Sequence, residues 1–346
     1  MCTARRPLAL LMIALMLLSP GGTMSETTIN QSSAGHGQLI CQDGIVYHLE
    51  HHATLFGKHS CLFRYENHSP SRVAWLPDTV EFSGIYHNAI LLDSVKTSLL
   101  EFNPLGRRFQ LFDPSTRTFQ ALPDPLEAFQ NAHGKCIIQT IDNTLFVKDD
   151  AQLYSYSPDQ DALTLVLDAI DYAAYYPDSI YVSASEKHYY VYGTDGNVRI
   201  IEVNERFPSP SVRMPYTDDL YYCLNHGGGF ELHRMNLISH SDVMLGEADA
   251  CKAEEMVISM DHTGEYLYFM VKNDAGGCSL KRFDLGSQQI DASFDYLIRE
   301  TQNAMYRYAK EILVTGSELY MVFAHNRLNS RDTFTSFLVD SFASPE

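Results

Sequence analysis

The feature that most constrains this chain is a phrase repeated seven times between about residue 39 and residue 340. Each copy holds an aromatic-rich apolar run, a short polar turn, a second apolar run, another turn and a third run; the copies at 145–167 and 266–284 are the clearest. Apolar runs that alternate with polar residues and are joined by Gly, Asp or Asn turns are typical of antiparallel strands. We therefore expect an all-β fold built from repeated meanders.

The spacing of the copies predicts how the meanders assemble. One copy takes roughly 40–50 residues, a period typical of closed β arrays in which each copy forms one sheet. In this architecture most of the chain resembles the β-propeller superfamily, although it has no Trp-Asp dipeptide and only one Trp. The resemblance implies a closed ring of seven blades, within a range of six to eight. It carries over no functional residues, because propellers host many unrelated functions.

The first 25 residues have the pattern of a cleaved export signal. Arg5 and Arg6 precede an unbroken apolar run at 8–18, and Pro20-Gly21-Gly22 follows it. Eleven apolar residues reach only about 16 Å as a helix, less than a bilayer core of about 30 Å. We expect a signal at 1–25, a loose segment at 26–38 and a single propeller domain at 39–346, with an N-terminal segment completing the last sheet. The protein is then periplasmic or secreted, with no membrane span after cleavage.

The charge of the chain restricts its partners. The formal net charge is −18, and it becomes −20 without residues 1–25, which carry two Arg and no acid. So acidic a protein repels nucleic acid and anionic membranes and attracts a basic protein partner.

Of the seven cysteines, Cys2 lies in the predicted signal and six remain. An even number in an exported protein favours pairing into disulfides. The pairings we expect are Cys41–Cys61, which we place on neighbouring strands, Cys251–Cys278 and Cys136–Cys223. No two cysteines have the two-residue spacing of a zinc knuckle.

A histidine-rich segment is the first candidate for chemistry. His48, Glu50 and His52 point to one face of a strand, where such side chains are typical metal ligands. Residues two apart on a strand lie nearly 7 Å apart, so a shared ion needs a bend or bulge. The alternative is a polar outer strand.

Tyrosines and acids in turns are the other candidates. Tyr175, Tyr176 and Asp178 lie in a predicted loop, and Asp218 and Asp219 lie in another; we expect these five residues to bind the partner. Acidic turns of this kind, with Asp149-Asp150 as a further example, also suggest structural calcium as a cofactor. The alternative is that the turn aspartates only shape the backbone.

The sequence contains no Gly-x-Ser-x-Gly nucleophile motif and no phosphate-binding loop. We therefore expect an exported, non-catalytic protein-binding propeller, for example a periplasmic inhibitor or immunity-type protein. The alternative is a propeller hydrolase or lyase acting on carbohydrate or peptide, with residues from several blades meeting at the centre.

Overall fold

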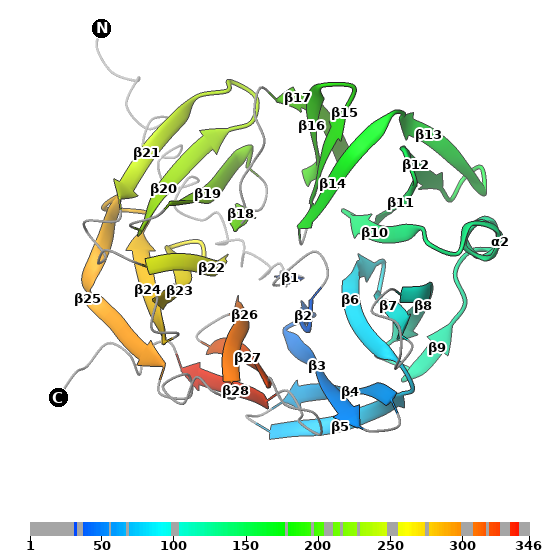
Figure 1. Ribbon diagram of the computed structural model, residues 1–346, viewed down its shortest axis with the longest axis horizontal. Coiled ribbons are helices and arrows are strands. Elements are labelled where there is room, and N and C mark those ends of the chain that lie inside the picture. The colour runs from blue at the N-terminus through cyan, green and yellow to red at the C-terminus, as the bar shows by residue number, and fades with distance from the viewer. Residues whose placement is uncertain are drawn as a thin grey trace, which may run out of the picture.

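The computed structural model describes residues 31–32, 37–54, 57–66, 69–97, 104–176, 179–194, 197–203, 210–214, 217–226, 229–247, 255–273, 277–298, 307–315, 318–325 and 333–338. Their strands form seven antiparallel sheets arranged in a ring (Figure 1). The expectation of an all-β propeller with six to eight blades, and seven as the favoured number, is confirmed. Each sheet consists of strands that are consecutive in the sequence, so we number the blades 1 to 7 in chain order.

Blades 1 to 4 contain the first seventeen strands. Blade 1 is β1 (Gln31–Ser32), β2 (Leu39–Gln42), β3 (Ile45–Thr54), β4 (Gly57–Glu66) and β5 (Ser69–Leu76); blade 2 is β6 (Thr79–Tyr86), β7 (Ala89–Thr97), β8 (Pro104–Asp113) and β9 (Thr118–Gln120); blade 3 is β10 (Ile137–Ile141), β11 (Thr144–Asp149), β12 (Gln152–Ser157) and β13 (Ala162–Leu167); blade 4 is β14 (Ile170–Tyr176), β15 (Ser179–Ala184), β16 (Lys187–Thr194) and β17 (Asn197–Val203).

Blades 5 and 6 have four strands each, and blade 7 has three among the described residues. Blade 5 is β18 (Ser211–Arg213), β19 (Asp219–His226), β20 (Gly229–Asn236) and β21 (Asp242–Glu247); blade 6 is β22 (Glu255–His262), β23 (Tyr266–Asn273), β24 (Cys278–Asp284) and β25 (Gln289–Ile298); blade 7 is β26 (Arg307–Thr315), β27 (Glu318–His325) and β28 (Thr333–Leu338). One helix, α2 (Asp124–His133), connects blade 2 to blade 3.

Tight two-residue turns set the register of several hairpins. Asp43 and Gly44 join β2 to β3, and Asp142 and Asn143 join β10 to β11; all four have positive φ, between 46° and 73°. Positive φ at both central residues defines the type I′ turn, whose twist matches that of paired strands. Gly, Asn and Asp adopt this conformation at less cost than other residues. The polar residues between the apolar runs therefore form the turns that their pattern predicts.

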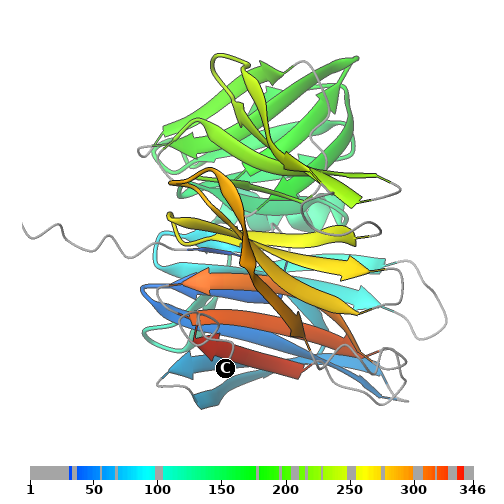
Figure 2. The same ribbon diagram turned by 90° about the vertical axis from the view of Figure 1, so that its left-hand side faces the viewer.

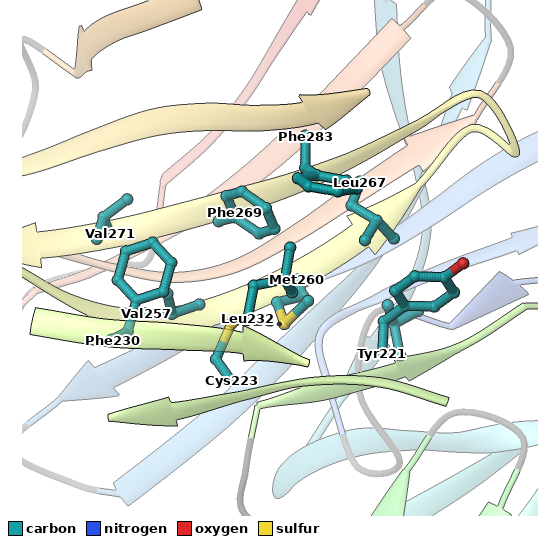
Figure 3. Packing of buried hydrophobic residues seen from close by; sticks show 11 residues of the cluster. Tyr221, Cys223, Phe230, Leu232, Val257, Met260, Leu267, Phe269, Val271 and Phe283 are labelled. Atoms are coloured by element: carbon teal, nitrogen blue, oxygen red, sulfur yellow. Dashed lines mark hydrogen bonds between the residues drawn. The ribbon is translucent and has the colours of Figure 1, made fainter. Parts of the chain in front are cut away.

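Buried side chains of facing sheets form a core between neighbouring blades. Between blades 5 and 6, Phe230 and Leu232 of β20 pack against Phe269 and Val271 of β23 (Figure 3). The rings of Phe230 and Phe269 lie 6.0 Å apart between centroids, with an angle of 57° between their planes. Burying one such side chain contributes roughly 1.5–3 kcal/mol. Because each blade is a separate sheet, these apolar cores are a principal attraction between blades.

Polar side chains make a second connection between neighbouring blades. Asn225 of blade 5 donates to the backbone oxygen of Val257 in blade 6 and accepts from its N–H, with both bonds 2.9 Å long. The Asp261 carboxylate of blade 6 accepts from the backbone N–H of Val314 in blade 7 at 2.6 Å. Each bond pairs a backbone group of one blade with a side chain of the neighbouring blade. These bonds therefore fix the position of one blade relative to the next.

The ring closes between blades 7 and 1 through Glu311. Its carboxylate accepts from the backbone N–H groups of Gln38, at 2.8 Å, and Leu39, at 3.0 Å. Figures 1 and 2 both show β26–β28 beside blade 1. The short strand β1 pairs with β2, within blade 1. In the described residues, then, no N-terminal segment completes the last sheet as expected, and side-chain contacts join blades 7 and 1 instead.

The expected pairing of Cys41 with Cys61 is wrong. Both are free, buried thiols. Cys41 lies in β2 and Cys61 in β4, and β3 runs between them. Two strand spacings of about 4.8 Å each place the Cα atoms beyond the roughly 7 Å that a disulfide tolerates.

The pairing of Cys136 with Cys223 is also wrong, because these residues lie in different interblade cores. Cys136 packs between blades 2 and 3, and Cys223 packs between blades 5 and 6. Cys278 is buried between blades 6 and 7, and its expected partner Cys251 lies outside the described residues. No disulfide joins two of the described cysteines.

Among the described residues, no helix is long and apolar enough to cross a membrane. The predicted signal at 1–25 lies outside these residues.

Candidate functional site

Imidazole, thiol and carboxylate groups gather on one face of blade 1. Side chains two apart on a strand share a face with the residues directly opposite them on the next strand. The β3–β4 ladder brings three such opposed pairs together: His48 with Phe63, Glu50 with Cys61, and His52 with His59. We call His48, Glu50, His52, His59 and Cys61 the blade 1 cluster.

The blade 1 cluster lies on the side of its sheet that faces blade 7. Val46 of β3 and Tyr65 of β4 occupy this face too, and they pack against Leu313 and Val322 of blade 7. His51 points to the opposite face, where its Nε2 lies 2.8 Å from the backbone oxygen of Val80 in blade 2. The strand alternation therefore separates His51 from its two histidine neighbours.

Glu50 stands between two histidines. Its Oε1 lies 3.8 Å from His48 Nε2, and its Oε2 lies 3.5 Å from His52 Nε2. His48 is buried and its ring stacks on Phe63, with 4.9 Å between centroids and 6° between planes. The carboxylate thus lies within ion-pair distance of both imidazoles.

The outer part of the cluster is a stack of rings. His52 and His59 lie 4.8 Å apart between centroids, with 9° between their planes. The ring centroid of Trp75 in β5 lies 5.3 Å from that of His59, and Trp75 is 57% exposed. The cluster therefore runs from a buried end at His48 to a partly exposed end at His52 and His59.

Burial governs the protonation of the cluster. It lowers the pKa of His48, with Glu50 opposing the shift, and it lowers the pKa of His59, which His52 lowers further. Burial raises the pKa of the Cys61 thiol, and Glu50 adds to the rise. At neutral pH, then, His48 and His59 are uncharged and Cys61 carries its proton.

The structure places the predicted ligands His48, Glu50 and His52 on one face, but it brings a different set closest together. The ligand atoms of His52, His59 and Cys61 all lie within 4.8 Å of one another. Cross-strand neighbours supply this closeness, so the bend or bulge required along a single strand is not needed. Metal binding by His48, Glu50 and His52 stays a prediction.

The missing ligands had a signal in the sequence. His59 lies in the same histidine-rich segment as His48 and His52, and β3 and β4 both run almost to the turn between them. A hairpin centred between residues 55 and 56 places His52 opposite His59. Extending both strands to that turn would have identified the pair.

The predicted tyrosine site lies largely within the fold. Tyr176 is buried between blades 4 and 5, and its backbone oxygen accepts a hydrogen bond from Gln139 of blade 3. Tyr175 packs against the core between blades 3 and 4, and burial raises its pKa, with Arg107 opposing the shift. Asp178 lies outside the described residues. Partner binding by these residues stays a prediction.

Asp218 and Asp219 hold neighbouring segments together. Asp218 accepts from Tyr192 Oη at 2.7 Å and from Arg199 Nη1 at 3.1 Å, which joins blade 4 to the start of blade 5. Asp219 accepts from Asn236 Nδ2 at 3.0 Å. The structure brings Asp218 and Tyr176 to the same interblade interface, where both make contacts that stabilise the ring.

The acidic turns considered for calcium make contacts of their own. Asp149 Oδ2 lies 2.5 Å from His133 Nδ1, at the end of α2. Asp161, which lies in the next turn along the chain and belongs to the same acidic group, accepts from Tyr156 Oη at 2.8 Å and has a φ of 47°. Both contacts fit the alternative in which turn acids shape the backbone, and calcium binding stays a prediction.

Three buried carboxyl groups were not singled out from the sequence. Burial raises the pKa of Asp93, Asp261 and Glu311 to about 7. Arg107 Nη1 lies 2.8 Å from Asp93 Oδ2 and opposes that rise, and backbone N–H groups oppose it at Asp261 and Glu311. These acids hold strands and blades together.

Comparison with known proteins confirms the fold. No protein-family model and no curated protein matches the sequence. Solved structures that are similar include a post-proline cleaving enzyme from Rickettsia typhi, with a TM-score of 0.53, 11% identity and coverage of 91% of this chain and 52% of that one. A puromycin-hydrolysing peptidase from Mycobacterium tuberculosis matches with a TM-score of 0.54 and 9% identity, over 88% of this chain and 51% of that one. A puromycin hydrolase matches with a TM-score of 0.52 and 10% identity, over 91% and 53%. This chain spans about half the length of each.

These similarities correct the leading interpretation of the sequence. A non-catalytic protein-binding module of the inhibitor or immunity type was favoured, but the similar structures belong to hydrolases and peptidases. They favour the alternative, a propeller hydrolase acting on peptide. At 9–11% identity the similarity establishes the fold alone, so the activity is a matter of proposal.

Proposed function

We propose that this propeller takes part in the hydrolysis of short peptides. The observation that carries the proposal is that most of the chain superposes on three structures named as a post-proline cleaving enzyme, a puromycin-hydrolysing peptidase and a puromycin hydrolase. Short peptides cleaved after proline are the first substrates to consider. Puromycin is the second.

We assign the binding of the peptide to the ring. The inner strands of a propeller surround a central channel, so a peptide entering it meets residues from several blades. The sequence has no Gly-x-Ser-x-Gly motif for a nucleophilic serine. We assign bond cleavage to a hydrolase unit that docks on the ring, because this chain spans only about half the length of each similar hydrolase. This unit takes the place of the basic protein partner expected from the charge.

The proposed location is the periplasm or the exterior of the cell. It rests on the signal-like sequence at 1–25, in which Arg5 and Arg6 precede the apolar run. The cysteines no longer support an oxidising compartment, because the pairings that could be checked do not form.

The test uses the tagged chain purified from its native host together with the proteins it retains. Fluorogenic peptides with proline before the cleaved bond are compared with matched alanine peptides, and a fluorophosphonate label identifies any reactive serine. We expect the complex to cleave the proline peptides and a co-purifying polypeptide to be labelled, while the chain produced alone is inactive. Cleavage by the chain alone would show that the catalytic groups lie in the propeller itself. A complex without hydrolytic activity and without a labelled polypeptide would refute the proposal.

A further inference from the structure

We propose that the blade 1 cluster binds one Zn²⁺ ion through His52, His59 and Cys61, with Glu50 as the carboxylate that orients His52. The three ligand atoms lie within 4.8 Å of one another, on two neighbouring strands. This site is independent of peptide hydrolysis and of any partner.

The donor atoms select the ion. Two imidazole nitrogens and one sulfur suit zinc, whereas calcium and magnesium require sets of oxygen ligands. Zn²⁺ binding displaces the Cys61 proton to solvent, so that the sulfur binds as a thiolate. Zinc accepts three protein ligands and completes its tetrahedron with water. Side-chain exposure of 24% at His52 leaves room for that water at the outer end of the cluster.

Binding needs only a small rearrangement. Bond lengths of about 2.0–2.3 Å place the ligand atoms of a zinc tetrahedron roughly 3.3–3.8 Å apart, so the cluster must contract by about 1 Å. The rings of His52 and His59 are nearly parallel, and a metal lies in the plane of an imidazole, so one ring must turn. Both histidines are partly exposed and lie near the β3–β4 turn, where rotation disturbs little of the core. The Cys61 thiol is buried and fixes the inner corner of the site.

Glu50 completes the arrangement. Its Oε2 lies 3.5 Å from His52 Nε2, close enough to accept the Nε2 proton after a small shift and leave Nδ1 for the metal. A carboxylate behind a ligating histidine fixes its tautomer and raises its basicity, and losing it typically lowers metal affinity about 10–100-fold.

The experiment measures Zn²⁺ bound to the reduced, metal-free mature chain, with the stoichiometry taken from elemental analysis and the affinity from competition with a chromophoric chelator. We expect one tight ion per chain. His59→Gln and Cys61→Ser should each lower the affinity by more than about 100-fold, and Glu50→Gln by about 10–100-fold. Matched controls are His240→Gln, at an exposed turn, and Cys136→Ser, in a different core; both should bind like the wild type.

Two further measurements on folded protein make the result specific. Co²⁺ in the wild-type site should give a near-ultraviolet sulfur-to-metal charge-transfer band that Cys61→Ser lacks. In the wild-type protein, Zn²⁺ should protect Cys61 from alkylation and leave the alkylation rate of Cys136 unchanged. This measurement needs no variant, so it tests the site even if a substituted chain does not fold. Binding well below one ion per chain, equal affinity in His59→Gln, or no protection of Cys61 would overturn the proposal.

Discussion

Removing the carboxylate of Glu311 should weaken the closure of the ring. This side chain is only 3% exposed and is the acceptor for the backbone N–H groups of Gln38 and Leu39. These bonds join the last blade to the first. Two substitutions separate the effects: Glu311→Gln keeps the shape and one acceptor oxygen, and Glu311→Ala removes both acceptors.

The size of each effect follows from the hydrogen bonds. Leaving one buried backbone donor without an acceptor costs about 1–3 kcal/mol. Glu311→Gln turns one oxygen into a donor, so we expect a loss of about 1–3 kcal/mol in the free energy of unfolding. Glu311→Ala leaves two backbone donors without an acceptor, so we expect the free energy of unfolding to fall by about 2–6 kcal/mol. A domain whose total stability is about 5–15 kcal/mol loses a large part of it in the second case.

The assay is urea denaturation at neutral pH, combined with hydrogen exchange of individual amides. Glu202→Ala serves as the control, because Glu202 forms an exposed pair with Lys187 and such pairs contribute little to stability. The Gln38 and Leu39 amides should exchange faster in both Glu311 variants. The reasoning is refuted if Glu311→Ala costs no more than the control, or if those two amides exchange at the wild-type rate.

Two further predictions concern a buried acid and a glycine of strand β6 that lies close to blade 3. Burial raises the pKa of Asp93 in the folded protein to about 7, above its pKa in the unfolded chain. The contribution of Asp93 to stability is therefore full below the unfolded pKa and is lost as pH rises through about 7. Between pH 5 and 8 the unfolding free energy of the wild type should fall relative to that of Asp93→Asn, on the order of 3 kcal/mol, in a urea titration repeated across pH; parallel curves would exclude the shift. Gly84 has a φ of 110°, and a Cβ there would lie 2.1 Å from Thr140 Oγ1. Gly84→Ala should therefore cost at least about 1–3 kcal/mol in thermal denaturation, and an unchanged melting temperature would contradict the geometry.

The blades were predictable because each consists of strands that are consecutive in the sequence. Every repeat in the sequence corresponds to one sheet, since apolar alternation and turn residues act over fewer than ten positions. The helix α2 was not anticipated: its short amphipathic pattern, with Leu126 and Gln130 as its buried residues, lies in a connection between two repeats. Local patterns specify strands and turns more strongly than they specify connections.

The candidate site depended on information that is not local. His59 and Cys61 join His52 only when the register of the β3–β4 hairpin is known, and a shift of one residue would turn them to the other face. The disulfide between Cys41 and Cys61 failed for the same reason, because two residues in one sheet need not lie on adjacent strands. Contacts between blades, such as that of Glu311 with Gln38, have no signal in a single sequence.

The contact between Gln38 and Glu311 spans 273 positions of the chain. Because each blade is contiguous, the blades can form one after another during synthesis, but the ring cannot close until its last blade has been made. Bringing ends so far apart together costs about 5 kcal/mol of chain entropy, from the logarithmic dependence on loop length. Until then, the face of blade 1 that carries Val46 and the face of blade 6 that carries Met270 have no blade 7 to cover them. Such exposed apolar faces are prone to aggregation. A nascent or truncated chain that ends before Glu311 should therefore depend on chaperones more than the complete ring does.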